Sequence, residues 1–182
     1  MEIHLFIIWS KALYKKDKII SHITTKFDIL HISNISWNRS KFSENLSRLY
    51  GKNLPQDSNK EKHCGNDTFT CIVVKDSNPV YQIRGTSKGQ RIVNVNLFDS
   101  KQLYRSWTGG GHKIHATDNV SESRVQTILL LKKSYEYFCD IKINKNISIK
   151  NDNELIGENG WDSLSSVFNA LNKTYKYVVL RN

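Results

Sequence analysis

Apolar and polar positions divide the first part of the chain into strands. Residues 3–9 form a continuous apolar run, which is typical of a central β-strand. Residues 27–36 alternate between apolar and polar positions and predict a second strand, and residues 68–76 predict a third. A short fourth strand is expected at 113–117. The pattern therefore predicts a four-stranded sheet.

Apolar residues at helical spacing separate these strands. A helix is predicted over 16–25, with isoleucines on one face. A second helix is expected after Ser40, which we interpret as its cap. A third is predicted over 121–138. The apolar residues of the second helix are Phe42, Leu46, Leu49 and Tyr50, and the inward face of the third is Val125, Ile128 and Leu129.

Two segments have a weaker pattern. Residues 51–67 contain one proline and two glycines and predict a polar loop. Residues 79–98 fit either a hairpin turning at 86–89 or a strand followed by a short helix. The order of elements corresponds to two βαβ-like halves with antiparallel neighbours. This order favours the α+β class, with a ferredoxin-like (split βαβ) antiparallel sheet and helices packed on it.

The composition changes after the third predicted helix. Residues 140–160 are rich in Asn and Lys, residues 161–174 predict a helix, and residues 175–180 predict an apolar strand. We therefore expect one domain over 1–138 and a C-terminal helix–strand extension over 139–182, which is either outside the core or the start of a further domain.

The charge of the chain favours anionic partners. Lys and Arg number 27 against 17 Asp and Glu, so the formal net charge is +10. Such a balance suits nucleotides, nucleic acid, other polyanions or a membrane surface, and the alternative is a solvated basic surface without a partner. The cysteines are three in number and without close pairs, which argues against a disulfide framework and predicts a reducing, cytoplasmic compartment. The apolar start is too short for a membrane span and lacks the charged opening of a signal peptide.

The stretch GGGHKIHATDNVSES, residues 109–123, carries the candidate chemistry. Asn119 and Glu122 match a capping box, so a helix N-terminus with free N–H groups is expected there. The glycines permit positive φ and close approach of the backbone. His115, just before that helix end, would face an anion held by it, and Arg105 and Arg91 upstream can bind phosphate oxygens. A neutral imidazole among cations is a good nucleophile towards phosphorus.

The run IHATDNVSES resembles the signature of nucleoside diphosphate kinases. In that family a histidine is followed by a small residue, Ser or Thr, Asp, Ser and Val, and here the run continues from His115 through Ala116, Thr117, Asp118, Asn119 and Val120. The resemblance extends more loosely over the first 138 residues. LFIIW is similar to the first strand of the family, NRSKFSENLSRLYGK to its second-helix segment with a tyrosine at Tyr50, and LYRSW to its catalytic-arginine segment at Arg105.

This resemblance implies the ferredoxin-like fold and a kinase that uses a phosphohistidine relay. His115 would take the terminal phosphate of a nucleoside triphosphate such as ATP and pass it to an acceptor, with Mg²⁺ bridging the phosphates. Arg105 would stabilise the transferred charge. The implied nucleotide-binding residues are Arg91, Tyr50, His112, Thr117 and Gly111, and Gln126 would orient His115. The implied partners are nucleoside triphosphates and diphosphates, and a homo-oligomer is compatible with the sequence.

Four features depart from the family. Trp9 stands where the family has a lysine, His112 where it has an asparagine, and Gln126 where it has a glutamate. The gap from Arg105 to His115 is also shorter. These departures predict slow transfer to nucleoside diphosphates, and they leave the acceptor open.

Alternative functions remain at this stage. The same site can serve an inactive module that binds a nucleotide or polyanion. RNA binding is not expected, because no RNP-type aromatic motif is present. A zinc site is not expected either, since His112 and His115 lack a second ligand pair nearby in sequence. The final residues, KTYKYVVLRN, resemble the opening strand of nucleotidyltransferase-type modules in larger bacterial surface-polysaccharide proteins, which would make this chain an N-terminal part.

Overall fold

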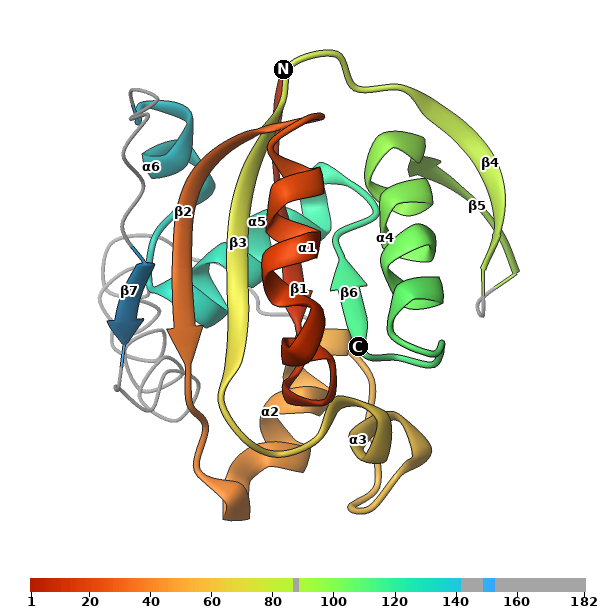
Figure 1. Ribbon diagram of the computed structural model, residues 1–182, viewed down its shortest axis with the longest axis vertical. Helices are drawn as coiled ribbons and strands as arrows, with labels where there is room; N and C mark the ends of the chain where they lie inside the picture. Colours follow the sequence, from red (N-terminus) through yellow and green to blue (C-terminus); the bar gives the residue numbers. More distant parts are fainter. Residues whose placement is uncertain (87–88, 142–148, 153–182) are drawn as a thin grey trace, which may run out of the picture.

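Four antiparallel strands form the main part of the sheet. The computed structural model describes residues 1–86 and 89–141, and the backbone of residues 149–152. The sheet has the order β6-β1-β3-β2-β7 (Figure 1). Its antiparallel strands are β1 (Glu2–Ile8), β2 (Asp28–Ile35), β3 (Phe69–Asp76) and β6 (Ile114–Ala116). Their order, fourth, first, third and second along the chain, is that of the ferredoxin-like fold, so this prediction is confirmed.

The fifth strand, β7 (Ile149–Asp152), pairs in parallel with β2. It lies within the segment that the sequence predicts as a C-terminal extension, so part of that segment joins the main sheet. The helix predicted over 161–174 and the strand predicted over 175–180 lie outside the described residues. The division at residue 138 therefore stays a prediction.

Helices cover both faces of the sheet (Figure 1). One face packs against α1 (Lys16–Ile23) and α4 (Val95–Trp107), and the other against α2 (Phe42–Tyr50), α5 (Val120–Leu131) and α6 (Tyr135–Cys139). Successive residues of a strand point to opposite faces. Phe6 and Ile8 of β1 therefore join the α1 and α4 core, while Leu5 and Ile7 join the other core. A strand buried on both sides explains the continuous apolar run at residues 3–9.

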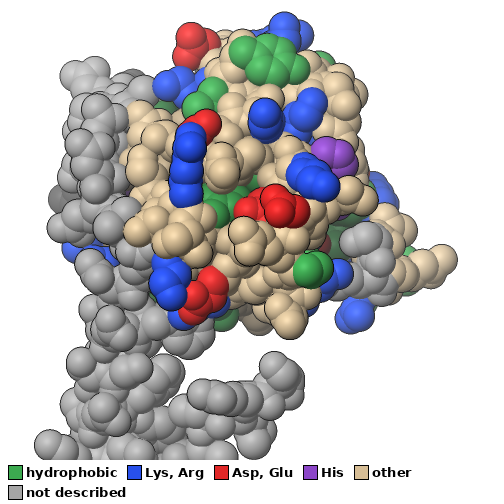
Figure 2. Space-filling view, turned by 90° about the horizontal axis from the view of Figure 1, so that it is seen from below, with side chains coloured by type: hydrophobic (Ala, Val, Ile, Leu, Met, Phe, Trp, Pro, Cys, Tyr) green, Lys and Arg blue, Asp and Glu red, His purple; other side chains and the backbone are tan. Residues whose placement is uncertain are grey.

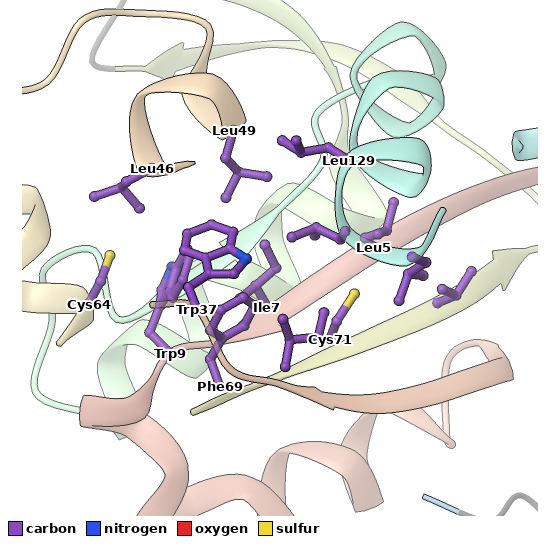
Figure 3. Close-up of a cluster of buried hydrophobic side chains, with 14 of the residues drawn as sticks. Leu5, Ile7, Trp9, Trp37, Leu46, Leu49, Cys64, Phe69, Cys71 and Leu129 are labelled. Atoms are coloured by element: carbon purple, nitrogen blue, oxygen red, sulfur yellow. The ribbon is translucent and has the colours of Figure 1, made fainter. Parts of the chain in front are cut away.

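An aromatic cluster fills the second core at the end of β1 (Figure 3). The ring centroid of Phe69 lies 4.6 Å from that of Trp9 and 4.9 Å from that of Trp37. Trp9 is fully buried there. The position that the resemblance gives to a lysine is thus part of the apolar core, and it brings no charge to the site.

A short helix, α3 (Asn59–Cys64), lies in the segment predicted as a loop. The Oγ atom of Ser58 accepts a hydrogen bond from the Glu61 amide at 3.3 Å. Ser58 and Glu61 have capping-box spacing, which is a sequence signal for a helix start. The loop prediction is wrong at this point, because the cap and the packing of the buried Cys64 outweigh the polar composition.

The segment over residues 79–98 is a hairpin followed by a long helix. Strands β4 (Tyr81–Thr86) and β5 (Gly89–Asn94) pair antiparallel, which confirms the hairpin alternative. Helix α4 then begins directly, with the side chain of Asn94 accepting from the Asn96 amide at 3.0 Å. This helix carries Arg105 in its last turn.

Two 3₁₀ helices precede longer helices. They are η1 (Ser10–Lys15), before α1, and η2 (Arg39–Lys41), before α2. Asn38 caps η2 by accepting from the Ser40 amide at 3.0 Å. The prediction that Ser40 caps the second helix is therefore wrong, since Ser40 lies inside η2.

The predicted helix over 121–138 is two helices. Helix α5 ends where Lys132 adopts a left-handed conformation with φ of 52°, and Ser134 begins α6 by accepting from the Tyr137 amide at 3.1 Å. The predicted inward face is also wrong in part: Leu129 is buried, but Val125 is 60% exposed and Ile128 is 37% exposed. Polar residues take the inward positions instead, namely Ser123, Gln126 and Thr127. The apolar pattern fails here because Gln126 is buried through hydrogen bonds to His115, Leu49 and Glu122.

Candidate active site around His115

Strand β6 points His115 towards α2 and α5. In the register of the sheet, His115 lies opposite Ile7 of β1. Its neighbours Ile114 and Ala116 face the other core. The loop before β6 contains three successive glycines, Gly109–Gly111, with φ between 75° and 78°. These left-handed conformations are accessible to glycine at little cost, which explains the glycine run.

A hydrogen bond to Gln126 fixes the tautomer of His115. The Nε2 atom of His115 lies 2.9 Å from Oε1 of Gln126. The amide nitrogen of Gln126 donates to the Leu49 carbonyl and to Oε1 of Glu122, each at 3.2 Å. Because both of those partners only accept, Oε1 must be the atom that faces His115. Nε2 of His115 therefore carries the hydrogen, and Nδ1 is left with its lone pair and without a hydrogen-bond partner among the described residues.

The ring of His115 is neutral and surrounded by cations. Burial lowers its pKa to about 3, with further lowering by Lys101, Arg105 and Lys60, while the hydrogen bond to Gln126 acts in the opposite direction. The pKa of His112 is lowered to about 4, first by burial and then by Lys60 and Arg105. The same two cations act on both histidines, so they share one region of positive potential. A neutral nitrogen in such a region can attack phosphorus without losing a proton first.

Tyr50 and Lys60 form one wall of the site. The rings of Tyr50 and His115 meet edge to face with centroids 5.2 Å apart. The Nζ atom of Lys60 lies 3.5 Å from the centroid of Tyr50. The Tyr50 hydroxyl is buried next to the indole of Trp9, and burial raises its pKa. It therefore stays protonated and can donate to a ligand oxygen.

Arg105 reaches the site from the last turn of α4. Its Nε atom donates to the Ile114 carbonyl at 2.9 Å, which holds the side chain beside β6. Burial lowers its pKa, but a guanidinium remains charged under these conditions. Its terminal nitrogens have no hydrogen-bond partner in the described part of the chain. They can bind phosphate oxygens as a fork.

The glycine loop packs against α3. A Cβ atom on Gly111 would lie 2.9 Å from Nδ1 of His63. The rings of His63 and His112 have centroids 5.6 Å apart, and Sγ of Cys64 donates to the His112 carbonyl at 3.6 Å. The absence of a side chain at Gly111 thus lets the loop and α3 approach, which brings His112 and Lys60 to the same region.

A pocket of about 680 Å³ opens between the end of α2, the β4–β5 hairpin and the start of α5. His115 does not line it but lies directly behind two lining residues, Tyr50 and Gln126, and is only 4% exposed. The sequence predicts that His115 lies in a cleft near Asn119. In the structure this is wrong in part, because Tyr50 and Gln126 stand between the histidine and the pocket. The polar residues that line this pocket include Arg48, Tyr50, Arg91, Asn119, Glu122 and Gln126.

The predicted site residues fall into three places. Tyr50, Arg91 and Gln126 line the pocket, with Arg91 exposed on β5. His112 and Gly111 lie against α3, beside Arg105. Thr117 is fully buried, and its hydroxyl bonds Nδ1 of His4 at 3.0 Å and the Leu5 amide at 3.2 Å. Thr117 thus ties the end of β6 to β1.

Several site residues were not found from the sequence. Lys101 of α4 bonds Oδ1 of Asp118 at 2.5 Å and holds the start of α5. Lys60 and His63 lie on α3. The capping-box spacing of Ser58 and Glu61 is the sequence feature that indicates this helix. Glu122 precedes Gln126 by four residues, a spacing at which helical side chains meet. No sequence pattern indicates Lys101, because its partner, Asp118, comes from a different segment of the chain.

The underside of the molecule is basic. Helices α2 and α3 lie at this end in Figure 1, and Figure 2 shows Lys and Arg side chains there beside a histidine. This agrees with the net charge of +10. No helix in the described ranges has the length and apolar character that crossing a membrane requires.

No protein-family model and no curated protein matches this sequence. Among solved structures, the chain is similar to an apo nucleoside diphosphate kinase from Encephalitozoon cuniculi in its cubic crystal form. The identity is 14%, the match covers 74% of this chain and 92% of that chain, and the TM-score is 0.48. At this level the similarity says nothing about activity, and the chemistry must be argued from the residues themselves.

Proposed function

We propose that this chain is a phosphotransferase that takes a phosphoryl group from a nucleoside triphosphate onto His115. The observation that carries the proposal is the state of the ring. Nε2 is held as N–H by Gln126, so Nδ1 is a neutral nucleophile among Lys60, Lys101 and Arg105. The match to the phosphohistidine signature at residues 114–123 points to the same residue.

The proposed step requires no general base. The lone pair of Nδ1 forms the N–P bond while the P–O bond to the leaving nucleoside diphosphate breaks. Nε2 keeps its hydrogen, so the phosphorylated ring carries a positive charge. In the second half-reaction an acceptor oxygen attacks phosphorus and the N–P bond breaks. Arg105 and Lys60 would stabilise the charge on the transferred oxygens, which is the main demand of such a loose transition state.

The pocket in front of His115 offers a place for the nucleotide. Arg91 and Arg48 can meet phosphates, and the exposed apolar side chains of Ile92 and Val125 can pack against a base. The Tyr50 hydroxyl supplies a donor towards the reacting group. These roles extend the set expected from the sequence, of which Arg91, Tyr50, His112 and Gly111 are retained here.

Mg²⁺ fits this arrangement as a companion of the nucleotide. The described residues contain no group of three or more His, Cys, Asp or Glu side chains that would hold a metal by themselves. The two carboxylates of the pocket are engaged, Asp118 with Lys101 and Glu122 with the Asp118 amide. Mg²⁺ is commonly held by substrate phosphates and water, and when bound it neutralises their charge.

An inactive binding module is the second candidate. It is favoured by one observation, the burial of His115, which is 4% exposed. In that case Arg105 and Lys60, which packs on the ring of Tyr50, would hold a nucleotide or another polyanion without turnover. The resemblance of the last residues to surface-polysaccharide proteins would then suggest a role as the N-terminal part of a larger chain.

Incubation with γ-labelled ATP and Mg²⁺ separates the two candidates. We expect an acid-labile label that disappears in His115→Ala and persists in a matched control, His31→Gln, on the distant strand β2. Thermal stabilisation by ATP without any label would favour the binding module. Equal labelling of His115→Ala would refute the proposed role of this residue.

A further inference from the structure

A carboxylate stands next to the hydrogen bond that holds His115. Oε1 of Glu122 lies 4.0 Å from Nε2 of His115 and accepts from the amide nitrogen of Gln126 at 3.2 Å. Oε2 of Glu122 accepts from the Asp118 amide at 2.7 Å. Both carboxylate oxygens are therefore held in place, and the three side chains form one chain of contacts, His115 to Gln126 to Glu122.

The charge of Glu122 faces a neutral ring before His115 is modified and a cationic ring afterwards. The unmodified ring is neutral, and Gln126 accepts its N–H without supplying charge. Once Nδ1 bonds to phosphorus, Nε2 remains N–H and the ring becomes cationic. The charged and titratable groups acting on the ring are Lys101 and Arg105 of α4, Lys60 of α3, Tyr50 of α2 and Glu122 of α5. Glu122 brings a carboxylate oxygen within 4.0 Å of Nε2, whereas the carboxylate of Asp118 is paired with Lys101 at 2.5 Å.

We propose that Glu122 is a positioning residue that stabilises the cationic phosphorylated ring of His115, with Gln126 as the link between them. The inference rests on the proposed function, because it assigns a task within the same reaction. This role of Glu122 and the role of a purely structural helix cap predict different results. A cap requires hydrogen-bond acceptors at position 122, whereas this role requires a negative charge within reach of Nε2.

A charge swap tests the difference. In Glu122→Gln the charge is lost. One of the two carboxylate oxygens, which accept from Asp118 and from Gln126, is replaced by an amide nitrogen that cannot accept. In the double variant Glu122→Gln, Gln126→Glu the carboxylate moves next to His115. The new amide at position 122 can then accept from the Asp118 N–H and donate to the new carboxylate. The contacts among positions 118, 122 and 126 are thus restored in mirror order, while the hydrogen bond to the Leu49 carbonyl is lost. Glu136→Gln on α6 is the matched control, since it removes one surface carboxylate that pairs with Arg124.

Two phosphorylating agents separate this inference from the proposed function. Mg²⁺-ATP tests the enzyme, while phosphoramidate transfers phosphate to neutral histidine without a nucleotide site. We expect the Nε2–H of phosphorylated His115 to become about tenfold more acidic in Glu122→Gln, as for the loss of an ion pair worth one pKa unit. Following the phosphorus-31 signal of the phosphorylated protein against pH measures this acidity. The double variant should reverse most of this change, and Glu136→Gln should behave like the unmodified protein.

The outcomes are distinct. Labelling by phosphoramidate but not by ATP would refute the proposed function, while the acidity of the phosphorylated ring would still test Glu122. Equal acidity of the phosphorylated ring in the unmodified protein and in Glu122→Gln would overturn the inference. Failure of the double variant to recover, with its fold intact by circular dichroism, would overturn it too. So would the absence of any label on His115 from phosphoramidate.

Discussion

The Nε2 atom of His115 lies 2.9 Å from Oε1 of Gln126, and this contact decides which ring nitrogen can react. The amide of Gln126 cannot turn round, because its nitrogen donates to Leu49 and Glu122. We therefore expect nitrogen-15 NMR of the ring to show the Nε2–H tautomer at neutral pH. A Gln126→Leu variant should lose this preference, since the ring then has no acceptor at Nε2. An Nδ1–H tautomer in the unmodified protein would contradict the assignment.

The buried histidine also makes stability depend on pH. The pKa of His115 is about 3 in the folded chain against 6.5 for a free histidine. Below pH 6.5 the unfolded chain binds a proton that the native state does not, so the free energy of unfolding falls as the pH falls towards 3. The slope from one such group is at most about 1.4 kcal/mol per pH unit. Above pH 6.5 His115 is neutral in both the folded and the unfolded chain, so it makes no contribution to the pH dependence of stability there.

Urea denaturation of the unmodified protein and His115→Gln at several pH values measures the contribution of His115 to the pH dependence of the free energy of unfolding. The difference between the two curves isolates His115 from other buried histidines such as His4, whose pKa is also lowered by burial. We expect the variant to lose less stability on acidification. Parallel curves would show that His115 is protonated in the native state.

Gly111 and Gly110 form a matched pair for testing the loop. Both have positive φ, at 75° and 78°, so alanine at either position costs about 1–2 kcal/mol of backbone strain. A Cβ at Gly111 would also meet Nδ1 of His63 at 2.9 Å, whereas one at Gly110 meets nothing within 4 Å. Gly111→Ala should therefore lower the thermal midpoint more than Gly110→Ala. Adding His63→Ala should remove that excess, and equal effects of the two alanines would contradict the packing.

Arg105 should bind phosphate through its free end. Arg105→Met keeps the length of the side chain but removes the fork, so we expect ATP binding to weaken about 10-fold to 100-fold, as for the loss of a charge-assisted pair worth about 1.5–3 kcal/mol. Arg39→Met is the control, because Arg39 makes an exposed pair with Asp67. Calorimetric titration with ATP measures both. Unchanged affinity in Arg105→Met would remove Arg105 from the proposed site.

Trp9 should contribute chiefly to stability. Its indole is fully buried among Trp37, Phe69 and Phe42, so Trp9→Ala should destabilise the fold by about 3–5 kcal/mol. Trp9→Lys should be at least as damaging, because it places an unpaired charge in the core. Chemical denaturation measures the loss. A folded Trp9→Lys variant with faster transfer to nucleoside diphosphates would contradict this view.

The sheet could be predicted because its strands are buried on both sides or alternate cleanly. The continuous run of β1 and the alternation of β2 reflect packing that any sequence of this fold requires. The apolar pattern failed where polar side chains are buried. Helix α5 turns Ser123 and Gln126 inward and leaves Val125 outside, so apolar spacing pointed to the wrong face. Helix α4 likewise buries Ser100 and Lys101.

The candidate site could be predicted in part. His115, Gln126 and Arg105 were expected from the motif and from the charge that phosphate requires, and the structure brings all three together. Lys60 and Lys101 were not expected, because they reach His115 from segments far apart in the sequence. Only the fold determines such contacts.

Phosphorus-31 NMR of the protein after incubation with Mg²⁺-ATP tests the central claim most directly, since it distinguishes phosphate on Nδ1 from phosphate on Nε2. Because Gln126 occupies Nε2, we predict a single phosphohistidine signal of the Nδ1 type, absent in His115→Ala and present in His31→Gln. A signal of the Nε2 type, or bound ATP with no phosphohistidine at all, would contradict transfer through His115.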